Sequence, residues 1–485
     1  MKSSVKSFIA AMSTILMVAV SCNKELAETT DSNLEKHTCE MKLVGSLVNF
    51  DEPATRSSAN ATTWADGSVI YLRMASPLGS TTGEAVYNAT TDVWTISYYG
   101  SLYEGSTNEC SALYLEDIVS YDNSLFEMNA QTVLYEDLGG SYIYEEGDLV
   151  VTANLKPKTG RIRFTGTPGS ILKIYGITHY STYDINTDIY TTSKESFKLT
   201  VGEDGFTPYF YGFFTDEDEP NVKVWIDAKE AYTRFCSKDI FNAGQSGKMT
   251  IPTSDSHNGW VEGLYFCMDG AKFKMIAVEG GTFVMGDPAS TSAYYTPHNV
   301  TLSGFCIAET EMTNQIYGKK LKLQGNNNAS SYTNQLPYYH VGKSSALTYV
   351  EQINNFIGSD LTLPTEAQWE FAARGGVKSK GYIYSGSDNL DDVGWYNCSA
   401  HAVKSKLPNE LGIYDMSGNV YEHVLDDYAE YPSNSQVNPC HDDTNDKLVV
   451  RGGSMDSYYA LSCTNYARFT SSSNNYQGIR FAINW

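Results

Sequence analysis

Short runs in which hydrophobic and polar residues alternate dominate the chain between residues 41 and 252. Residues 69–72 and 222–226 are typical runs, and clusters of Gly, Asn, Asp or Ser separate each run from the next. Alternation with a period of two, bounded by turn residues, indicates half-buried strands, and helical periodicity is scarce here. The pattern predicts two β-sandwich units, at residues 41–150 and 151–252.

A helical pattern appears later in the chain, at residues 363–376. Trp369, Ala372 and Ala373 recur at i, i+3 and i+4, which gives one apolar helical face. Thr365 is a good N-cap residue with Gln368 three positions later, and Gly375–Gly376 would end the helix. We therefore expect a helix between Thr365 and Gly375.

The first residues have the pattern of an export signal. Two lysines, at positions 2 and 6, precede an apolar run at residues 8–20, which is too short to span a membrane. Small residues then lead to Cys22, as in a bacterial lipobox, although Ala19 stands where Leu is usual. We expect removal of residues 1–21, lipid attachment to Cys22 and a flexible tether at 22–40, which places the protein on the outer membrane or cell surface. An ordinary signal peptide with a chance cysteine is the alternative.

Composition excludes several function classes. The 485 residues carry a formal net charge of −23, so a phosphate backbone would be repelled and nucleic acid is excluded as a partner. The nine cysteines include no C-x-x-C pair, which disfavours zinc and iron–sulfur sites. Outside the cytoplasm, some of the eight cysteines other than Cys22 are expected to form disulfides.

A glycine-containing turn at residues 410–423 combines two carboxylates with exposed carbonyl groups. Asp415, Gly418, Val420 and Glu422 lie within eight residues. A hard cation such as Ca²⁺ takes six or more oxygen ligands in flexible geometry, so this turn is a candidate Ca²⁺ site. Helix caps or solvated carboxylates are the alternative interpretation.

Several ordered motifs together resemble one enzyme family. They are residues 275–286 (MIAVEGGTFVMG), 363–376 (LPTEAQWEFAARGG), 410–423, 450–454 (VRGGS) and 478–482 (GIRFA). The set, which covers residues 274–485, is similar to the formylglycine-generating-enzyme or sulfatase-modifying-factor family. The resemblance implies a second, α+β domain at residues 274–485 with a fold like that of C-type lectins, after a linker at residues 253–273. It also implies a structural Ca²⁺ held by Asp415, the backbone oxygens of Gly418 and Val420, and Glu422.

The same resemblance argues against the family's oxidase activity. Catalytic members hold copper with two cysteines, five apart, shortly after the Gly-Gly-Ser. Here Cys463 lies near the second position, but Asp456 or Ser457 occupies the first. A hydroxyl or a carboxylate does not replace a thiolate as a ligand of Cu(I). Copper is therefore disfavoured as a cofactor. Cys463 would be a catalytic residue only if the protein were an oxidase of this family, and we otherwise expect it to be buried or disulfide-bonded.

The segment at residues 456–476 is unusually rich in Tyr, Ser and Asn. Tyr gives rigid contact area and Ser and Asn give adaptable hydrogen bonds, as in antibody paratopes. The segment is similar to the variable region of C-type-lectin-fold proteins that bacterial retroelements diversify; a polar loop with a chance bias is the alternative. The predicted residues that bind a glycan or protein ligand are Asp456, Ser457, Tyr458, Tyr459, Ser462, Asn465, Tyr466, Asn474, Asn475 and Tyr476.

Residues 64–71 (WADGSVIY), 153–164 and 241–251 are similar to motifs of fimbrillin-like proteins, the pilins and anchors of Bacteroidetes-type fimbriae. That resemblance implies strand addition between fimbrial subunits and a protease cut at Arg56, although a solvated loop arginine is an equal alternative. A globular domain occupies the end where a shaft pilin would donate its strand, which suits a fimbrial tip.

These observations favour a cell-surface lipoprotein that acts as an adhesin or ligand-binding protein, at a fimbrial tip, with a non-catalytic lectin-fold domain. Two alternatives stay open. One is a formylglycine-generating oxidase or a related metal-dependent enzyme. The other is a structural fimbrial anchor, for which replacing the tyrosines at 456–476 would leave adhesion unchanged.

Overall fold

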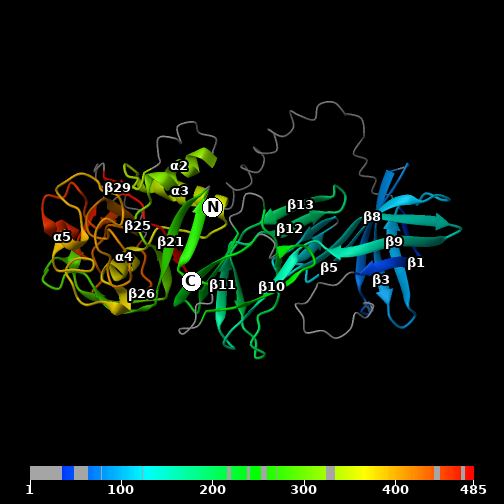
Figure 1. Ribbon diagram of the computed structural model, residues 1–485, viewed down its shortest axis with the longest axis horizontal. Coiled ribbons are helices and arrows are strands. Elements are labelled where there is room, and N and C mark those ends of the chain that lie inside the picture. Colours follow the sequence, from blue (N-terminus) through cyan, green and yellow to red (C-terminus); the bar gives the residue numbers. More distant parts are fainter. Residues whose placement is uncertain are drawn as a thin grey trace. The chain divides into compact units, whose positions relative to one another are not determined.

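The computed structural model describes residues 35–47, 64–77, 79–122, 124–215, 220–237, 241–252, 259–268, 270–323, 334–441, 448–470 and 476–485. The chain divides into two compact units. The first contains Trp64–Ser111 and Gly139–Thr152 with the chain up to Val44, and the second contains Ala112–Leu138 and Ala153–Trp485 with residues 45–63 (Figure 1). The predicted signal peptide, Cys22 and Arg56 lie outside the described residues, so the predictions for them stay predictions.

The first β unit is a closed barrel, where the sequence indicated a sandwich. Its strand order is β1-β4-β3-β2-β5-β8-β9. Alternation shows that one face of each strand is buried, but it does not show whether the sheet edges meet. Strand β1 begins at Lys36, so the last part of the predicted tether is a strand paired with β4. The bounds are β1 Lys36–Leu47, β2 Val69–Ser76, β3 Gly79–Asn88, β4 Val93–Tyr99, β5 Asn108–Glu116, β8 Val133–Glu145 and β9 Asp148–Pro157.

The second β unit consists of small sheets around an aliphatic and aromatic core. Strand β9 runs through the predicted boundary at residue 150, so the two β units are not separate along the chain. One sheet is β15 (Phe210–Gly212), β10 (Gly160–Thr165) and β18 (Ser246–Thr250). A second is β14 (Phe197–Thr200), β11 (Ile171–Tyr175), β16 (Asn221–Ile226), β17 (Glu230–Phe235) and β19 (Val261–Glu262). A third is β13 (Ile189–Ser193), β12 (His179–Asp184), β7 (Leu125–Glu127) and β6 (Ser120–Asp122).

Residues 259–268, which we expected to form a linker, are ordered. Strand β19 pairs with β17, and the Trp260 side chain is buried in the core of the second β unit, with its ring N–H donating to the Thr250 carbonyl at 3.0 Å. The expectation of a linker is wrong for this stretch because burial of one tryptophan fixes the backbone on either side of it.

The C-terminal part is α+β, as predicted. Its sheets are β20-β21-β24-β30, β22-β23-β26 and β28-β27-β25-β29. The strand bounds are β20 Leu264–Met268, β21 Ala271–Val278, β22 Gly281–Met285, β23 His298–Leu302, β24 Phe305–Ala308, β25 Tyr421–Asp427, β26 Gln436–Val437, β27 Leu448–Arg451, β28 Arg468–Thr470, β29 Gln477–Gly478 and β30 Ala482–Asn484. The helices are α2 Asn314–Leu323, α3 Lys343–Ile357, α4 Glu366–Ala373 and α5 Leu390–Val393, with 3-10 turns η3 Ala293–Tyr295, η5 Gly376–Lys378 and η6 Ala460–Cys463. None of the described helices is long and apolar enough to cross a membrane.

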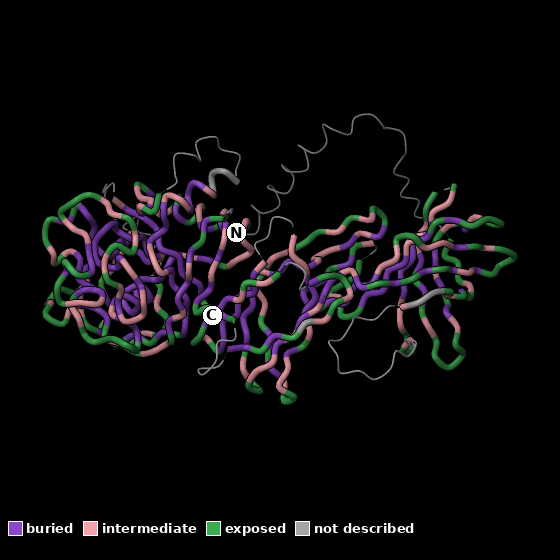
Figure 2. The backbone as a smooth tube through the Cα atoms, in the orientation of Figure 1, coloured by how far each residue is buried: buried purple, intermediate pink, exposed green. Residues whose placement is uncertain are grey.

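Helix α4 begins where the sequence predicted. The Thr365 hydroxyl accepts a hydrogen bond from the Gln368 backbone N–H at 3.2 Å, and the Gln368 side chain accepts from the Thr365 N–H at 2.9 Å. This reciprocal capping box is confirmed. Every residue of α4 is buried, including Glu366 and Glu370, so a helix that looks amphipathic in sequence lies entirely inside the domain (Figure 2).

The second β unit and the C-terminal part share a hydrophobic core. Tyr175 and Trp225 belong to the same buried cluster as Phe266 and Phe481, and the Trp225 ring meets Trp485 edge-on at 4.8 Å. The buried Lys173 ammonium forms an ion pair with Asp360 and donates to the Asn484 carbonyl at 3.0 Å. This core anchors β30 and the end of the chain.

Candidate functional site

Buried ion pairs hold the base of the candidate site. Glu366 and Glu370 lie four residues apart on α4 and therefore on one face of the helix. Arg451 donates to Glu366 at 3.0 Å and to Glu370 at 2.6 Å, and Arg468 donates to Glu366 at 2.8 and 2.6 Å. Burial of unpaired charge is costly, so these contacts fix the end of β27 and the start of β28, which bracket the Gly-Gly-Ser turn.

A second buried pair joins the cation turn to the end of the chain. The Arg480 guanidinium donates to both Glu422 oxygens at 2.7 to 3.0 Å, and the Trp369 ring N–H donates to Glu422 at 2.6 Å. Glu311 lies beside this pair and accepts from the Val420 backbone N–H at 3.1 Å and from the Asn419 side chain at 2.7 Å. Helix α4, the turn and the end of the chain are thus connected through Glu422.

The predicted Ca²⁺ ligands can be tested against this geometry. One Asp415 oxygen accepts from the Lys404 N–H at 2.8 Å, while the other is buried without a hydrogen-bond partner. Burial raises the pKa of Asp415 to about 6, and burial with the Asp415 and Glu422 charges raises the pKa of Glu311 well above its usual range. Burial and mutual repulsion therefore disfavour the ionised forms of Asp415 and Glu311, and a divalent cation beside them would stabilise those ionised forms.

These observations fit a cation at Asp415, but Glu422 already accepts four donor contacts. In the described part of the chain, no group of three or more His, Cys, Asp or Glu side chains could hold a metal ion. A site that uses the Gly418 and Val420 carbonyl oxygens is of a different kind, and the Ca²⁺ site at Asp415, Gly418, Val420 and Glu422 stays a prediction.

The Gly-Gly-Ser turn covers Cys463. Gly452 and Gly453 have φ angles of +89° and +72°, and a Cβ on Gly453 would lie 2.6 Å from the Cys463 sulfur. Both residues must therefore be glycine. The Ser457 hydroxyl and the Ser454 backbone lie near the Cys463 thiol and offset part of the effect of burial on its pKa, and Ser457 occupies one candidate position for the family's first thiolate. No disulfide joins any two of the eight described cysteines, so the expected disulfides are absent among the described residues, whereas burial of Cys463 is confirmed.

Cys463 is expected to be unreactive at neutral pH. Burial raises the pKa of its thiol to about 12, so fewer than about one thiol in 10⁴ is ionised at pH 7.5, and the thiolate is the reactive form. Iodoacetamide should therefore modify Cys463 at least about 100-fold more slowly than the exposed Cys398. Peptide mass spectrometry of native and denatured protein measures both rates. Equal rates in the native protein would contradict the buried placement.

The predicted ligand-binding residues divide by burial. Tyr458 and Tyr459 are 72% and 70% exposed with their rings edge-on at 5.0 Å, and Leu461 beside them is 70% exposed. Asp456 is also exposed, and Ser462, Tyr466 and Tyr476 are half-buried. Asn474 and Asn475 lie outside the described residues. The exposed triplet of Tyr458, Tyr459 and Leu461 is hereafter the tyrosine tip.

The prediction that Ser457 and Asn465 bind the ligand is wrong, because both residues are buried. The Ser457 hydroxyl accepts from the Ser454 N–H at 2.9 Å, and the Asn465 side chain donates to the Tyr382 carbonyl at 2.9 Å. Their polar groups satisfy backbone groups of the turn and its neighbours, so they support the surface and do not form it.

Two residues that the sequence did not indicate join the site. Tyr339 and His340 have ring centroids 6.0 and 6.2 Å from that of Tyr476, and Tyr339 forms a β-bridge with Gly478. The three rings form a second aromatic group at the start of β29. The bridge and a hydrogen bond from the Val341 N–H to the Gln477 carbonyl at 3.1 Å join the two segments, and no local motif near residue 339 predicts this pairing.

The family described as "Sulfatase-modifying factor enzyme 1-like domain" matches residues 269–485. The chaperone protein LppX of Paenibacillus barcinonensis is 31% identical over an alignment of 217 residues, and the alignment covers 33% of this chain and 75% of that protein. The chain belongs to the sulfatase-modifying factor family. The formylglycine-generating enzyme of Streptomyces coelicolor is 32% identical over 161 residues, covering 28% of this chain and 48% of the enzyme.

Membership of the sulfatase-modifying factor family concerns the C-terminal part, and the chain spans less than half of that enzyme. Among solved structures, Treponema denticola variable protein 1 is 23% identical with a TM-score of 0.40, covering 45% of this chain and 98% of that one. A fimbrial protein from Bacteroides ovatus is 11% identical with a TM-score of 0.24, covering 93% and 100%. At TM-scores this low, the likeness supports no conclusion about function.

Proposed function

We propose that this protein is a cell-surface adhesin whose sulfatase-modifying-factor domain binds a glycan or protein ligand through the tyrosine tip and performs no oxidation. The main observation behind this proposal is that Tyr458, Tyr459 and Leu461 are exposed on a short turn. Buried ion pairs hold the base of that turn. Large apolar side chains on a monomer's surface mark interaction sites when they are contiguous. Lipid attachment at Cys22, an outer-membrane location and a place at a fimbrial tip belong to the same proposal.

The chemistry beneath the turn supports binding over catalysis. Cu(I) selects soft sulfur ligands, whereas the Ser457 hydroxyl occupies a candidate position for the family's first thiolate and lies beside the Cys463 thiol. The rigid base also favours binding, because a preorganised surface loses little conformational entropy when it meets its ligand. The aromatic group of Tyr339, His340 and Tyr476 supplies further contact area from the same domain.

The test is binding of the full mature chain and its Tyr458→Ser/Tyr459→Ser variant to glycan and protein arrays. We expect the variant to lose at least about tenfold in apparent affinity for the ligands of the wild-type chain, because tyrosines dominate such surfaces. Its free energy of unfolding should change by less than about 0.5 kcal/mol per residue, since both side chains are exposed. Thermal unfolding checks the second point.

The matched control is Tyr99→Ser, which replaces a tyrosine that is 53% exposed in the closed barrel. It should bind as the wild type does. Unchanged binding by the double variant would contradict the role of the tyrosine tip. Stoichiometric, tight Cu(I) binding that disappears in Cys463→Ser would contradict the non-catalytic proposal and favour the oxidase.

A further inference from the structure

A row of cations lies on the outer face of the β15-β10-β18 sheet. Along β10, Ile162 and Phe164 point into the core, while Arg161, Arg163 and Thr165 are partly exposed. Strand β18 runs parallel to β10, and its register places Ser246 opposite Arg161 and Lys248 opposite Arg163. The three cations Arg161, Arg163 and Lys248 are hereafter the cation row.

Arg163 and Lys248 form a like-charged pair without an anion. Directly opposed like charges on neighbouring strands destabilise a sheet. In the part of the chain that the structure describes, neither side chain has an ion-pair partner; each instead contacts the Phe206 ring, with centroid distances of 4.2 and 5.5 Å. The chain has a net charge of −23, so carboxylates that could pair with these two cations are plentiful. The absence of such a pair among the described residues therefore suggests that the two cations bind an external anion.

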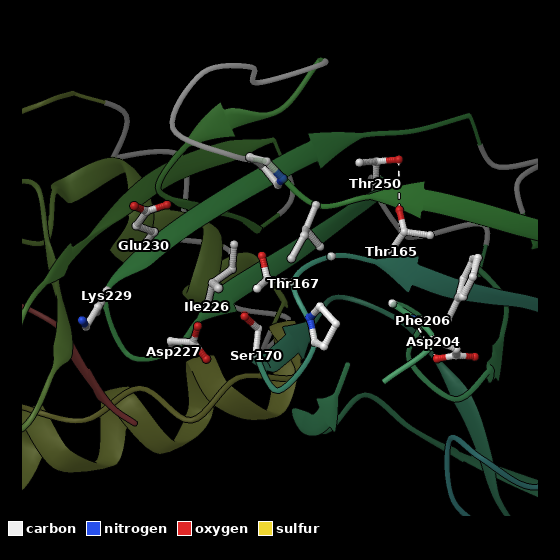
Figure 3. A pocket seen from close by; sticks show the side chains of 15 residues that line it. Thr165, Thr167, Ser170, Asp204, Phe206, Ile226, Asp227, Lys229, Glu230 and Thr250 are labelled. Carbon is white, nitrogen blue, oxygen red and sulfur yellow. Dashed lines mark hydrogen bonds between the residues drawn. The ribbon is translucent and has the colours of Figure 1, made fainter. Parts of the chain in front are cut away.

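The surrounding groups hold the row in place. The Arg161 guanidinium stacks over Tyr209 at 4.1 Å and donates to the Ser246 hydroxyl at 2.8 Å. At the other end, the Thr165 hydroxyl donates to the Thr250 hydroxyl at 3.1 Å (Figure 3). The rings fix the planes of the guanidinium groups, and the hydroxyls add hydrogen-bonding groups on either side. Strand geometry spaces the cations by about 5 to 7 Å.

We propose that the cation row binds the sulfate or carboxylate groups of an acidic polysaccharide. Planar guanidinium groups match such anions with two parallel hydrogen bonds. An acidic protein is the less suitable partner, because protein interfaces have an apolar centre, whereas the rings on this face are covered by cations. The neighbouring cavity of about 720 Å³ is a poorer site for the anion, since three carboxylates, those of Asp204, Asp227 and Glu230, line it with a single cation, Lys229 (Figure 3).

The experiment compares a sulfated hexasaccharide, its desulfated form and a polyglutamate peptide of equal charge. Binding to the full mature chain and to Arg163→Gln/Lys248→Gln is measured by calorimetry at two salt concentrations. We expect the sulfated probe to bind the wild-type chain more tightly than its desulfated form and polyglutamate to bind least, with affinity that falls as salt rises and at least about tenfold weaker binding of the sulfated probe by the double variant. The variant should be at least as stable as the wild type, because its like-charged pair is gone.

Lys272→Gln is the control, since Lys272 also lies over an aromatic ring, that of Phe235 at 5.1 Å, and its loss changes the net charge. The control should bind the sulfated probe as the wild type does. Unchanged binding by Arg163→Gln/Lys248→Gln, or equal losses in the control, would overturn the site. Binding of polyglutamate as tight as that of the sulfated probe would overturn the choice of a polysaccharide and favour an acidic protein.

Discussion

Replacing Glu366 with Gln should lower the free energy of unfolding by about 3–5 kcal/mol, because it leaves a buried guanidinium without its carboxylate. Glu366 is the only described carboxylate paired with Arg468, and it also accepts from Arg451 and from the Tyr431 hydroxyl at 3.1 Å. The neutral amide has one acceptor oxygen where four donors converge. Urea unfolding of the full chain, followed by tryptophan fluorescence, measures the loss.

Glu279→Gln is the matched control for this change. Glu279 is paired with Lys229 at 3.5 Å, but the two side chains are 49% and 62% exposed. Exposed ion pairs contribute less than about 1 kcal/mol, so the control should unfold almost as the wild type does. If Glu366→Gln were no more destabilising than Glu279→Gln, the base of the tyrosine tip would not depend on these ion pairs. The variant should also bind the array ligands less well, because the turn would lose its support.

Local patterns predicted what local interactions determine. The capping box of α4 needs only Thr365 and Gln368, three residues apart, and it formed as expected. The α+β character of the C-terminal part followed from a set of short motifs. Cys463 was expected to be buried or disulfide-bonded, and it is buried.

Contacts between distant residues account for what the sequence did not predict. Closure of the barrel depends on pairing of β1 with β4, whose residues are more than 50 positions apart. Burial of Trp260 against Thr250 removed the expected linker. Composition indicated a binding segment at 456–476, but composition alone does not predict which side chains point into the core, as those of Ser457 and Asn465 do. The pairing of Tyr339 with Gly478 spans most of the domain and left no local signal.

The buried arginines show the same limit at the site. Arg451, Arg468 and Arg480 pair with carboxylates between 58 and 102 residues away in the chain. In sequence, each looks like a surface cation. Only the folded structure shows that Arg451 and Arg468 support the Gly-Gly-Ser turn and that Arg480 pairs with the predicted cation ligand Glu422.

Replacing Trp225 with Ala should destabilise the C-terminal part although Trp225 belongs to the second β unit. Its fully buried side chain contacts Trp485 and shares a cluster with Phe266 and Phe481. Truncating a buried tryptophan costs about 3–5 kcal/mol, through lost burial and the cavity left behind. Because the core is continuous, that loss should reach β24 and β30. Hydrogen exchange of their backbone amides, measured by mass spectrometry, should become at least about 100-fold faster where exchange requires cooperative unfolding.

Trp94→Ala provides the matched control, because Trp94 is equally a buried tryptophan but lies in the closed barrel. It should accelerate exchange in β2 to β4 and leave β24 and β30 unchanged. If Trp225→Ala instead accelerated exchange only in β11, β16 and β17, the second β unit and the C-terminal part would unfold independently. A shared unfolding unit has a consequence for adhesion: force applied to the ligand at the tyrosine tip would be resisted by one core formed by both parts, including the buried Lys173–Asp360 pair.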